Sequence, residues 1–315
     1  MASLKGIVME WRSGRQAEGG GRVHLAAFGK HPAWADHFGP LGSLTEVLDH
    51  VMSLLERAVR ENVNKGTWEA KPQQTIPFGH LFLWRREQDI VAGRMWYSMD
   101  TGGRDKFPMT VCAHAQGLSV GWVTRHVLTC LAEIETACRK AERADVVHRC
   151  LADAQQQLQG LAQGASAETS AADGQKPPDP WAGLLGLGLD RDYLDGIVQY
   201  LDARTSEDAP RTGGKNRVVN PVAARVVIPV EHAAEALLFW TDILVAKYGK
   251  DRSILVLVPR EKAWADIFLG EPTSWQLRCL RLSPAGLSLT GESRGPIATE
   301  PADRGQPPSG DTPAS

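Results

Sequence analysis

Charged side chains stand beside glycine, proline and large aromatic residues in two short segments, Phe28–Phe38 and Trp96–Thr110. Four charges stand out: Lys30 and Asp36 in the first segment, Asp100 and Arg104 in the second. Two acids and two bases in otherwise apolar segments predict a buried or half-buried ion network in which the two segments meet. The alternative is that the charges lie on turns in water, where an ion pair contributes only about 0–1 kcal/mol.

Nucleophilic catalysis is a second chemistry that the same region could support. Cys112 lies two residues from His114, and residues i and i+2 of a strand share a face. Ser98 lies two residues from Asp100 in the same way. A hydrolase that uses these four side chains is therefore the alternative function, and it requires them to converge in one pocket, because adjacency alone does not activate a nucleophile.

Metal binding is a third possibility for the first segment. His31 and His37, with Asp36 between them, could place ligands around a turn, and His24 and His50 could join them. Zinc sites usually have tighter spacing and a matched second pair of ligands, and this sequence has neither. We therefore expect surface or hydrogen-bonded imidazoles, with no metal, no other cofactor and no catalytic residue.

Two further features of the segments could serve recognition. A turn at Gly103 and Arg104 could present backbone N–H groups to an anion, although a purely structural turn is the simpler interpretation. Trp34 lies between Pro32 and Asp36 in a predicted turn, which makes it our candidate for an exposed anchor at a protein interface. Packing in the core is the competing role for Trp34.

Composition limits the class of protein. The chain has 315 residues, of which 43% are hydrophobic, and its net charge is −2, so it lacks the strongly basic character of a nucleic-acid-binding protein. The first residues lack the apolar stretch of a signal peptide, and no segment approaches the roughly 20 apolar residues that span a bilayer. Five cysteines without a CxxC pair indicate reduced thiols. We expect a soluble cytoplasmic protein that neither inserts into a membrane nor binds nucleic acid.

Hydrophobic periodicity predicts the elements that position these residues. Ser43 and Glu46 form a predicted capping box for a helix over 43–62, with Leu44 first in its apolar stripe. Strands are predicted over 23–28, 77–84, 91–99, 109–114, 224–230, 254–258 and 277–282. Further helices are predicted from 119 to 161 with breaks, within 181–203, and over 233–248 and 262–269. The fold class is therefore mixed α/β (α+β), a largely antiparallel mixed sheet flanked by helices.

The domain prediction is a single-domain core over residues 23–290. A flexible segment is predicted over 1–22, a flexible insertion over 164–180, and a disordered tail over 291–315, because small and polar residues dominate these stretches. A split into two domains near Gly164 is the alternative.

The two segments resemble the signatures of the TagF family, also called ImpM, which is associated with bacterial type VI secretion. The first signature, F-G-K-x-P-x-x-x-D-F, is similar to the run that contains Phe28, Gly29, Lys30, Pro32 and Asp36. The second, S-x-D-x-x-G-R followed by F-P-L-T, is similar to Ser98, Asp100, Gly103, Arg104, Phe107, Pro108, Met109 and Thr110. The tract 235–242 resembles a tryptophan-bearing helix late in the family. His37 and one extra residue between Arg104 and Phe107 depart from the pattern.

This resemblance implies a bacterial, non-enzymatic, cytoplasmic regulator. It would repress type VI secretion after translation by protein–protein binding, with a forkhead-associated scaffold protein of that system as the suspected partner. The interaction candidates are the motif residues Gly29, Lys30, Pro32, Trp34, Asp36, Ser98, Asp100, Gly103, Arg104, Phe107 and Pro108.

Overall fold

The computed structural model describes residues 21–165, 181–207 and 221–290. The predicted N-terminal segment lies outside these residues except for its last two positions, and the predicted insertion except for its first two. The predicted tail over 291–315 lies wholly outside them. Within the described part of the chain, no helix is long and apolar enough to cross a membrane.

One continuous sheet organises the described residues. Its eight strands have the order β2-β1-β5-β4-β3-β7-β8-β6, and each described pairing is antiparallel. The strands are β1 (Arg22–Gly29), β2 (Phe38–Gly42), β3 (Gly79–Arg86), β4 (Asp89–Trp96), β5 (Met109–Gln116), β6 (Val222–Val227), β7 (Ile254–Pro259) and β8 (Trp264–Leu269). The predicted fold class is confirmed: helices flank an antiparallel sheet in a mixed α/β arrangement.

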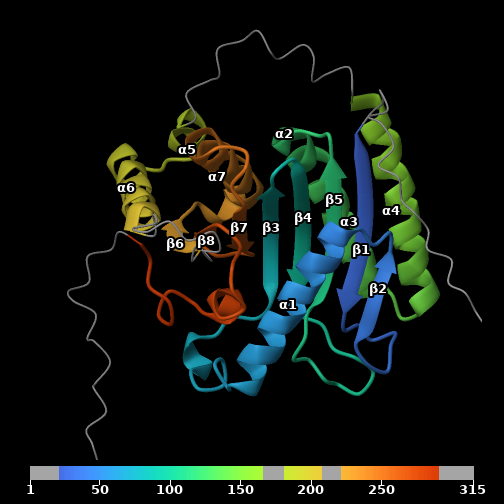
Figure 1. Ribbon diagram of the computed structural model, residues 1–315. Helices are drawn as coiled ribbons and strands as arrows, with labels where there is room; N and C mark the ends of the chain where they lie inside the picture. The colour runs from blue at the N-terminus through green and yellow to red at the C-terminus, as the bar shows by residue number, and fades with distance from the viewer. Residues whose placement is uncertain (1–20, 166–180, 208–220, 291–315) are drawn as a thin grey trace, which may run out of the picture.

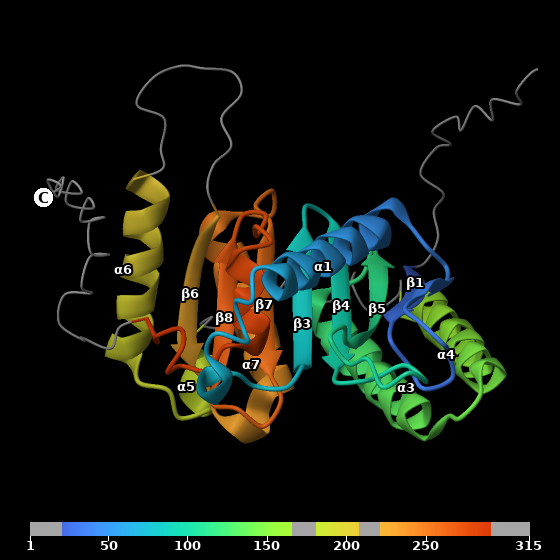
Figure 2. The ribbon, with the colours of Figure 1, turned by 90° about the horizontal axis from the view of Figure 1, so that it is seen from below.

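Helices cover both faces of this sheet (Figures 1 and 2). Helix α1 crosses one face, whereas α3, α4 and α7 lie on the other, and α6 stands beside the edge formed by β6. The helices are α1 (Glu46–Asn64), α2 (Val120–Trp122), α3 (Leu128–Lys140), α4 (Ala144–Gly164), α5 (Ala182–Gly186), α6 (Arg191–Glu207) and α7 (Ala233–Tyr248). A π-helical turn, Val123–Val127, joins α2 to α3, so the long predicted helical region is one helix with an irregular turn followed by α4.

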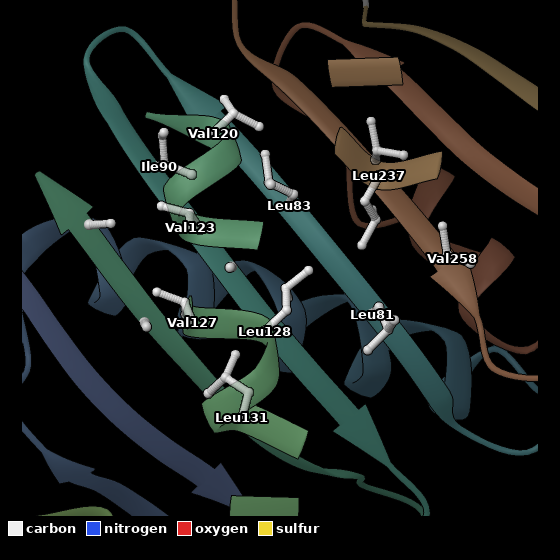
Figure 3. Close-up of a cluster of buried hydrophobic side chains, with 14 of the residues drawn as sticks. Leu81, Leu83, Ile90, Val120, Val123, Val127, Leu128, Leu131, Leu237 and Val258 are labelled. Atoms are coloured by element: carbon white, nitrogen blue, oxygen red, sulfur yellow. The ribbon is translucent and has the colours of Figure 1, made fainter. Parts of the chain in front are cut away.

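Two hydrophobic clusters hold the layers together. The larger lies between the sheet and α3, α4 and α7, and Figure 3 shows part of it, where Val120 and Val123 lie beside Leu83 and Ile90 and Leu131 lies further along the helix. The smaller lies beneath α1. Alternation along the strands separates the two clusters, because successive side chains point to opposite faces of a sheet.

Helix α1 begins two residues later than its first cap signal predicts. The hydroxyl of Thr45, not that of Ser43, accepts the hydrogen bond from the Leu48 N–H, at 3.2 Å. Ser43 instead donates its backbone N–H to the Leu25 carbonyl at 2.8 Å, which keeps it in the extended chain that follows β2. The predicted capping box was therefore wrong, and Leu44 is exposed rather than part of the apolar stripe.

Two other predictions were wrong and one strand was missed. Residues 264–269 form strand β8 rather than a helix, because a turn at Glu261 folds this apolar run back onto β7. Residues 277–282 lie mostly in a 3₁₀ helix, Gln276–Arg281, whose spacing buries Leu277 and Leu280 together. Strand β2 contains two glycines and a proline, so its sequence has no strand signal.

Glutamines on α4 satisfy the edge of β1 that β2 leaves uncovered. The Gln155 side chain accepts the Leu25 N–H at 2.7 Å and donates to the Val23 carbonyl at 2.6 Å. The Gln159 side chain accepts the Val23 N–H at 3.0 Å. These contacts block an edge that would otherwise present unpaired backbone groups.

Candidate functional site

The two motif segments meet at one end of the sheet. The first motif loop, residues 30–37, connects β1 to β2, and the second motif loop, residues 97–108, connects β4 to β5. Because Met109 is opposite both Gly29 and Trp96, the two loops leave the sheet side by side. The expected meeting of the two segments is confirmed.

Gly29 and Pro108 form the closest backbone approach between the motifs. Gly29 has φ +119°, and a Cβ atom at this position would lie 2.0 Å from the Pro108 carbonyl oxygen. Lys30 donates its backbone N–H to the same oxygen at 3.4 Å. Only glycine fits this position, both for its backbone angle and for the space.

Asp100 organises the second motif loop around its own carboxylate. Its Oδ1 atom accepts the backbone N–H groups of Gly102 and Arg104, each at 3.0 Å. The backbone N–H of Gly103, whose φ is +73°, donates to the Asp100 carbonyl at 2.9 Å. The turn thus does present N–H groups to an anion, but that anion is Asp100 itself, which leaves a structural role for the turn.

Asp100 also anchors the ion network. Its Oδ2 atom lies 2.5 Å from Lys30 Nζ and 2.8 Å from Arg104 Nε. Asp36 completes the network at 3.3 Å from Lys30 and 3.2 Å from Arg104 Nη2. The network is half-buried: the Lys30 and Asp100 side chains are 6% and 0% exposed, whereas those of Arg104 and Asp36 are 54% and 68% exposed.

These contacts favour the charged form of both acids. The hydrogen bond from Lys30, with the Arg104 N–H and both cationic charges, lowers the pKa of Asp100 to about 2, despite desolvation. The pKa of Asp36 is lowered mainly by the backbone N–H of His37 and by Lys30. Both carboxylates are therefore committed to ion pairs at neutral pH.

Backbone contacts and the ring of Trp34 fix the first loop. Thr101 donates its N–H to the Trp34 carbonyl at 3.0 Å, and Arg104 Nη2 donates to the Ala35 carbonyl at 2.7 Å. The Trp34 indole is half-buried and stacks on Phe38 with ring centres 4.5 Å apart. Trp34 therefore packs on the core cluster and is not a fully exposed anchor.

The remaining motif residues divide between interior and surface. Ser98 and Pro108 are buried, Phe107 is half-buried against the ring of His37 at 5.4 Å, and Pro32 is exposed. His31 is buried; its Nε2 donates to the Cys138 carbonyl at 2.8 Å and its Nδ1 accepts the Ala33 N–H at 3.0 Å. Desolvation lowers the pKa of His31, although the Cys138 carbonyl opposes that shift.

The second motif loop also has two large exposed side chains, Tyr97 and Met99, that the sequence did not indicate. Tyr97 and Met99 are 40% and 39% exposed, whereas Ser98 and Asp100 point inward. The Tyr97 hydroxyl donates to Asp105 at 2.9 Å. The signal that could have found them is the alternation along residues 97–100, which places the aromatic and the methionine on one face.

The four groups of the hydrolase alternative do not form one site. Both oxygens of Asp100 are used within the motif loops, and Cys112 is buried in the core beneath α1, where desolvation raises its pKa to about 12. His114 lies further along β5, opposite Val91, and its Nδ1 is 3.0 Å from the Thr45 hydroxyl that caps α1. Asp89 lies 2.9 Å from the other ring nitrogen without hydrogen-bond alignment. This chain of groups ties a helix cap to the sheet, with His114 2% exposed.

Two buried ion clusters were missed in the sequence. Glu135 of α3 is buried among Arg94, Arg139 and Arg260, at 2.6–2.9 Å. On the opposite face of the sheet, Arg225 of β6 pairs with Asp266 of β8 at 2.6 and 2.8 Å. Lone charges inside apolar runs are the signal for such pairs, because an unpaired buried charge is costly.

A pocket that touches the motif loops is small and is lined in part by His37, Phe107 and Pro108. Within residues 21–165, 181–207 and 221–290, no group of three or more His, Cys, Asp or Glu side chains could hold a metal ion. A groove of about 760 Å³ lies along α4, lined by Gly42, Ser43, His148, Leu151, Ala152, Gln155, Gln156, Gln159, Gly160 and Gln163. The ion network lines no part of this groove.

Comparisons with known proteins give likenesses to solved structures only. No protein-family model and no curated protein matches the chain. The chain is similar to the solved structure of PA0076 from Pseudomonas aeruginosa PAO1, with 16% sequence identity and a TM-score of 0.30. The match covers 45% of this chain and 77% of that chain, and a likeness at this level does not bear on function.

Proposed function

We propose that this protein is a TagF-like regulator that represses bacterial type VI secretion by binding a forkhead-associated scaffold protein. The observation that carries the proposal is the convergence of the two motif loops. Residues 70 positions apart, Lys30 and Asp100, join in a buried ion pair, and Gly29 lies against Pro108. The residues on which the family resemblance depends therefore build a single surface rather than two unrelated turns.

The chemistry of this surface suits binding better than catalysis. Lys30 and Asp100 are both engaged in the contacts that hold the two loops together. The buried part of the network therefore has no unpaired acid or base. Arg104 and Asp36 remain accessible, and Tyr97 and Met99, in the same loop as Arg104, add exposed apolar area. Arginine, tyrosine and methionine are enriched in protein interfaces.

Capture of the partner from the native host tests the proposal. The tagged protein is purified from cells that express the secretion apparatus, alongside Met99→Asp and a control, Val230→Asp. Val230 is 42% exposed, similar to Met99, but lies between β6 and α7, at the edge of the sheet that β6 forms and four strands away from β4. We expect the wild type and the control to retain the scaffold protein and Met99→Asp to lose it.

Two results would contradict the proposal. One is the absence of the scaffold protein from the wild-type preparation although the apparatus is expressed. The other is equal retention by all three proteins, which would place any binding surface elsewhere on the molecule. Secretion assays in a strain that lacks the gene add a functional readout, since the wild type and Val230→Asp should restore repression and Met99→Asp should not.

A further inference from the structure

Strand β6 forms one edge of the sheet, and much of its outward backbone is hydrogen-bonded within the protein. Arg225 donates its N–H to the Thr290 hydroxyl at 3.0 Å and accepts the Thr290 N–H at 2.7 Å. Val227 donates its N–H to the Tyr193 hydroxyl at 2.7 Å. These contacts prevent another strand from pairing along this part of the edge.

Ala223 is a gap in this protected edge. Backbone groups that point outward alternate along an antiparallel edge strand, so those of Ala223 point to the same side as those of Arg225. On the other side of Ala223, the Pro221 carbonyl accepts a hydrogen bond from the Gln276 side chain at 2.8 Å. Among the described residues, no group pairs with the outward N–H and carbonyl of Ala223. The edge can therefore accept the backbone of about one further residue here.

A pocket of about 230 Å³ lies at this gap. Ala223 lines it from β6, Trp275 and Arg278 line it from the region of the 3₁₀ helix that follows β8, and Thr290 lines it from the segment paired with β6. Trp275 is 55% exposed, so its ring offers apolar surface to a ligand. Unpaired backbone groups, an accessible aromatic ring and a cation therefore line one cavity.

The cation of this pocket, Arg278, has no acidic partner in the part of the chain that the structure describes. Arg278 is half-buried, and its guanidinium carbon lies 3.1 Å from the centre of the Trp275 ring. Its Nη1 donates to the Trp275 carbonyl at 3.4 Å, a long hydrogen bond. Desolvation lowers the pKa of Arg278, and the nearby charge of Arg225 acts in the same direction. Most of the five N–H donors of this guanidinium are thus available to an anion.

The other ion pair that lines the pocket is satisfied within the protein. Both oxygens of Asp266 accept hydrogen bonds from Arg225, at 2.6 and 2.8 Å. The remaining donors of Arg225 bind backbone carbonyls. This pair adds no net charge, so Arg278 leaves the pocket positively charged.

We propose that this pocket binds the C-terminal end of an extended peptide segment from a partner protein. The peptide backbone accepts a hydrogen bond from the Ala223 N–H and donates one to the Ala223 carbonyl, as an added strand does. Because Thr290 occupies the edge at Arg225, the paired chain ends within the pocket, and its terminal carboxylate accepts hydrogen bonds from Arg278. This surface is separate from the motif loops, and the proposal does not depend on the function proposed for them.

Capture of peptides by the immobilised full-length protein tests the proposal. The probe is a pool of N-acetylated hexapeptides of random sequence, supplied once with a free C-terminal carboxylate and once with a C-terminal amide. Mass spectrometry quantifies the retained peptides. We expect the wild type to retain the acids about tenfold more strongly than the amides, because only the acids place a carboxylate on Arg278.

Three variants assign the binding to this pocket. Arg278→Gln should lose the preference for the acids. Arg252→Gln is the matched control and should keep it, because Arg252 is also half-buried beside an aromatic ring, 5.9 Å from the centre of Tyr248, but lines no part of this pocket. Should Arg278→Gln fail to fold, Trp275→Ala, at an exposed position, should still weaken retention of the acids. Circular dichroism establishes that each variant is folded.

Four results would overturn the proposal. Retention of neither pool by the wild type would show that the pocket binds no peptide end, and equal retention of acids and amides would show that a terminal carboxylate is not recognised. An unchanged preference in a folded Arg278→Gln variant would place the binding site elsewhere. A preference that appears only in the full-length variant Glu292→Gln would show that an acid of the chain itself, two residues after Thr290, occupies the cation.

Discussion

Two ion clusters in this protein pair aspartate with basic side chains but differ in how far those side chains are buried. In the core, Arg225 and Asp266 are each 2% exposed, and the Arg225 guanidinium also donates to the carbonyls of Leu282, Leu287 and Cys279. In the motif loops, Lys30 and Asp100 are buried but Arg104 is half-exposed. The donors of Arg225 are used inside the protein, whereas the loop network leaves one cation, Arg104, half-exposed.

The comparison predicts the largest loss of stability in the core. Asp266→Leu leaves the Arg225 charge buried without a counter-ion and should lower the free energy of unfolding by about 3–5 kcal/mol. The double variant Arg225→Met with Asp266→Leu removes both charges and should recover part of that loss, although three carbonyls lose their donor. Urea denaturation of the three proteins measures the difference, and a double variant no better than the single one would contradict this account.

A backbone substitution comes next in expected size. Gly29→Ala places a methyl group against the Pro108 carbonyl and forces alanine into a backbone angle that it disfavours, so it should cost more than about 2 kcal/mol. Gly39→Ala is the matched control, because a Cβ atom there meets nothing within 4 Å. Equal thermal midpoints for the two variants would show that the close approach of the motifs does not constrain the fold.

Removal of the buried cation of the loop network should have a smaller effect. Lys30→Met keeps the aliphatic stem but takes away the closest partner of Asp100, and the loss should be about 2 kcal/mol, because Arg104 and two backbone N–H groups still hold the carboxylate. Urea denaturation provides the measurement. A loss of unfolding free energy as large as that for Asp266→Leu would mean that Asp100, like Arg225 in the core, has no adequate partner once its buried counter-ion is removed.

The pH dependence of stability gives a finer distinction. The folded pKa of Asp100, about 2, lies below its ordinary value of 3.8, so the charged form stabilises the folded state. This stabilisation is fully present above the ordinary value and is lost as the pH falls towards 2. The difference in unfolding free energy between the wild type and Asp100→Asn should therefore shrink over that interval. A difference that stays constant from neutral pH down to pH 2 would contradict the assignment.

The sequence predicted the meeting of the motif loops because their charges and glycines lie in short, recognisable runs. It also predicted most strands and α7, whose apolar periodicity is continuous. It could not predict β8, because the run from Trp264 to Leu269 is buried on both faces and lacks the alternation of a half-exposed strand, and its pairing with β7 depends on a turn at Glu261 without glycine. It missed Tyr97 and Met99 because exposure depends on how the loop leaves the sheet, which is a tertiary property.

The partners of the buried charges could not be predicted from the sequence either. Glu135 follows Ile134 in a stripe that otherwise predicts a plain amphipathic helix, and its partners Arg94 and Arg260 come from β4 and from the end of β7. No local pattern connects positions so far apart in the chain. By contrast, Arg139 lies one helical turn from Glu135, and that single partner was accessible to sequence reasoning.

The central claim is that the motif loop pair binds the scaffold protein, and a binding measurement with purified components tests it most directly. Titration calorimetry compares the wild type with Arg104→Glu and with Arg191→Glu, a charge reversal on α6, beside the edge of the sheet that β6 forms. Each arginine has an acidic partner four residues away, but Asp100 is buried whereas Asp195 is half-exposed, so the reversal at Arg104 should cost more stability, and circular dichroism first establishes that both variants are folded. The account predicts that Arg104→Glu abolishes binding while Arg191→Glu binds like the wild type. Unchanged affinity in a folded Arg104→Glu variant would contradict it.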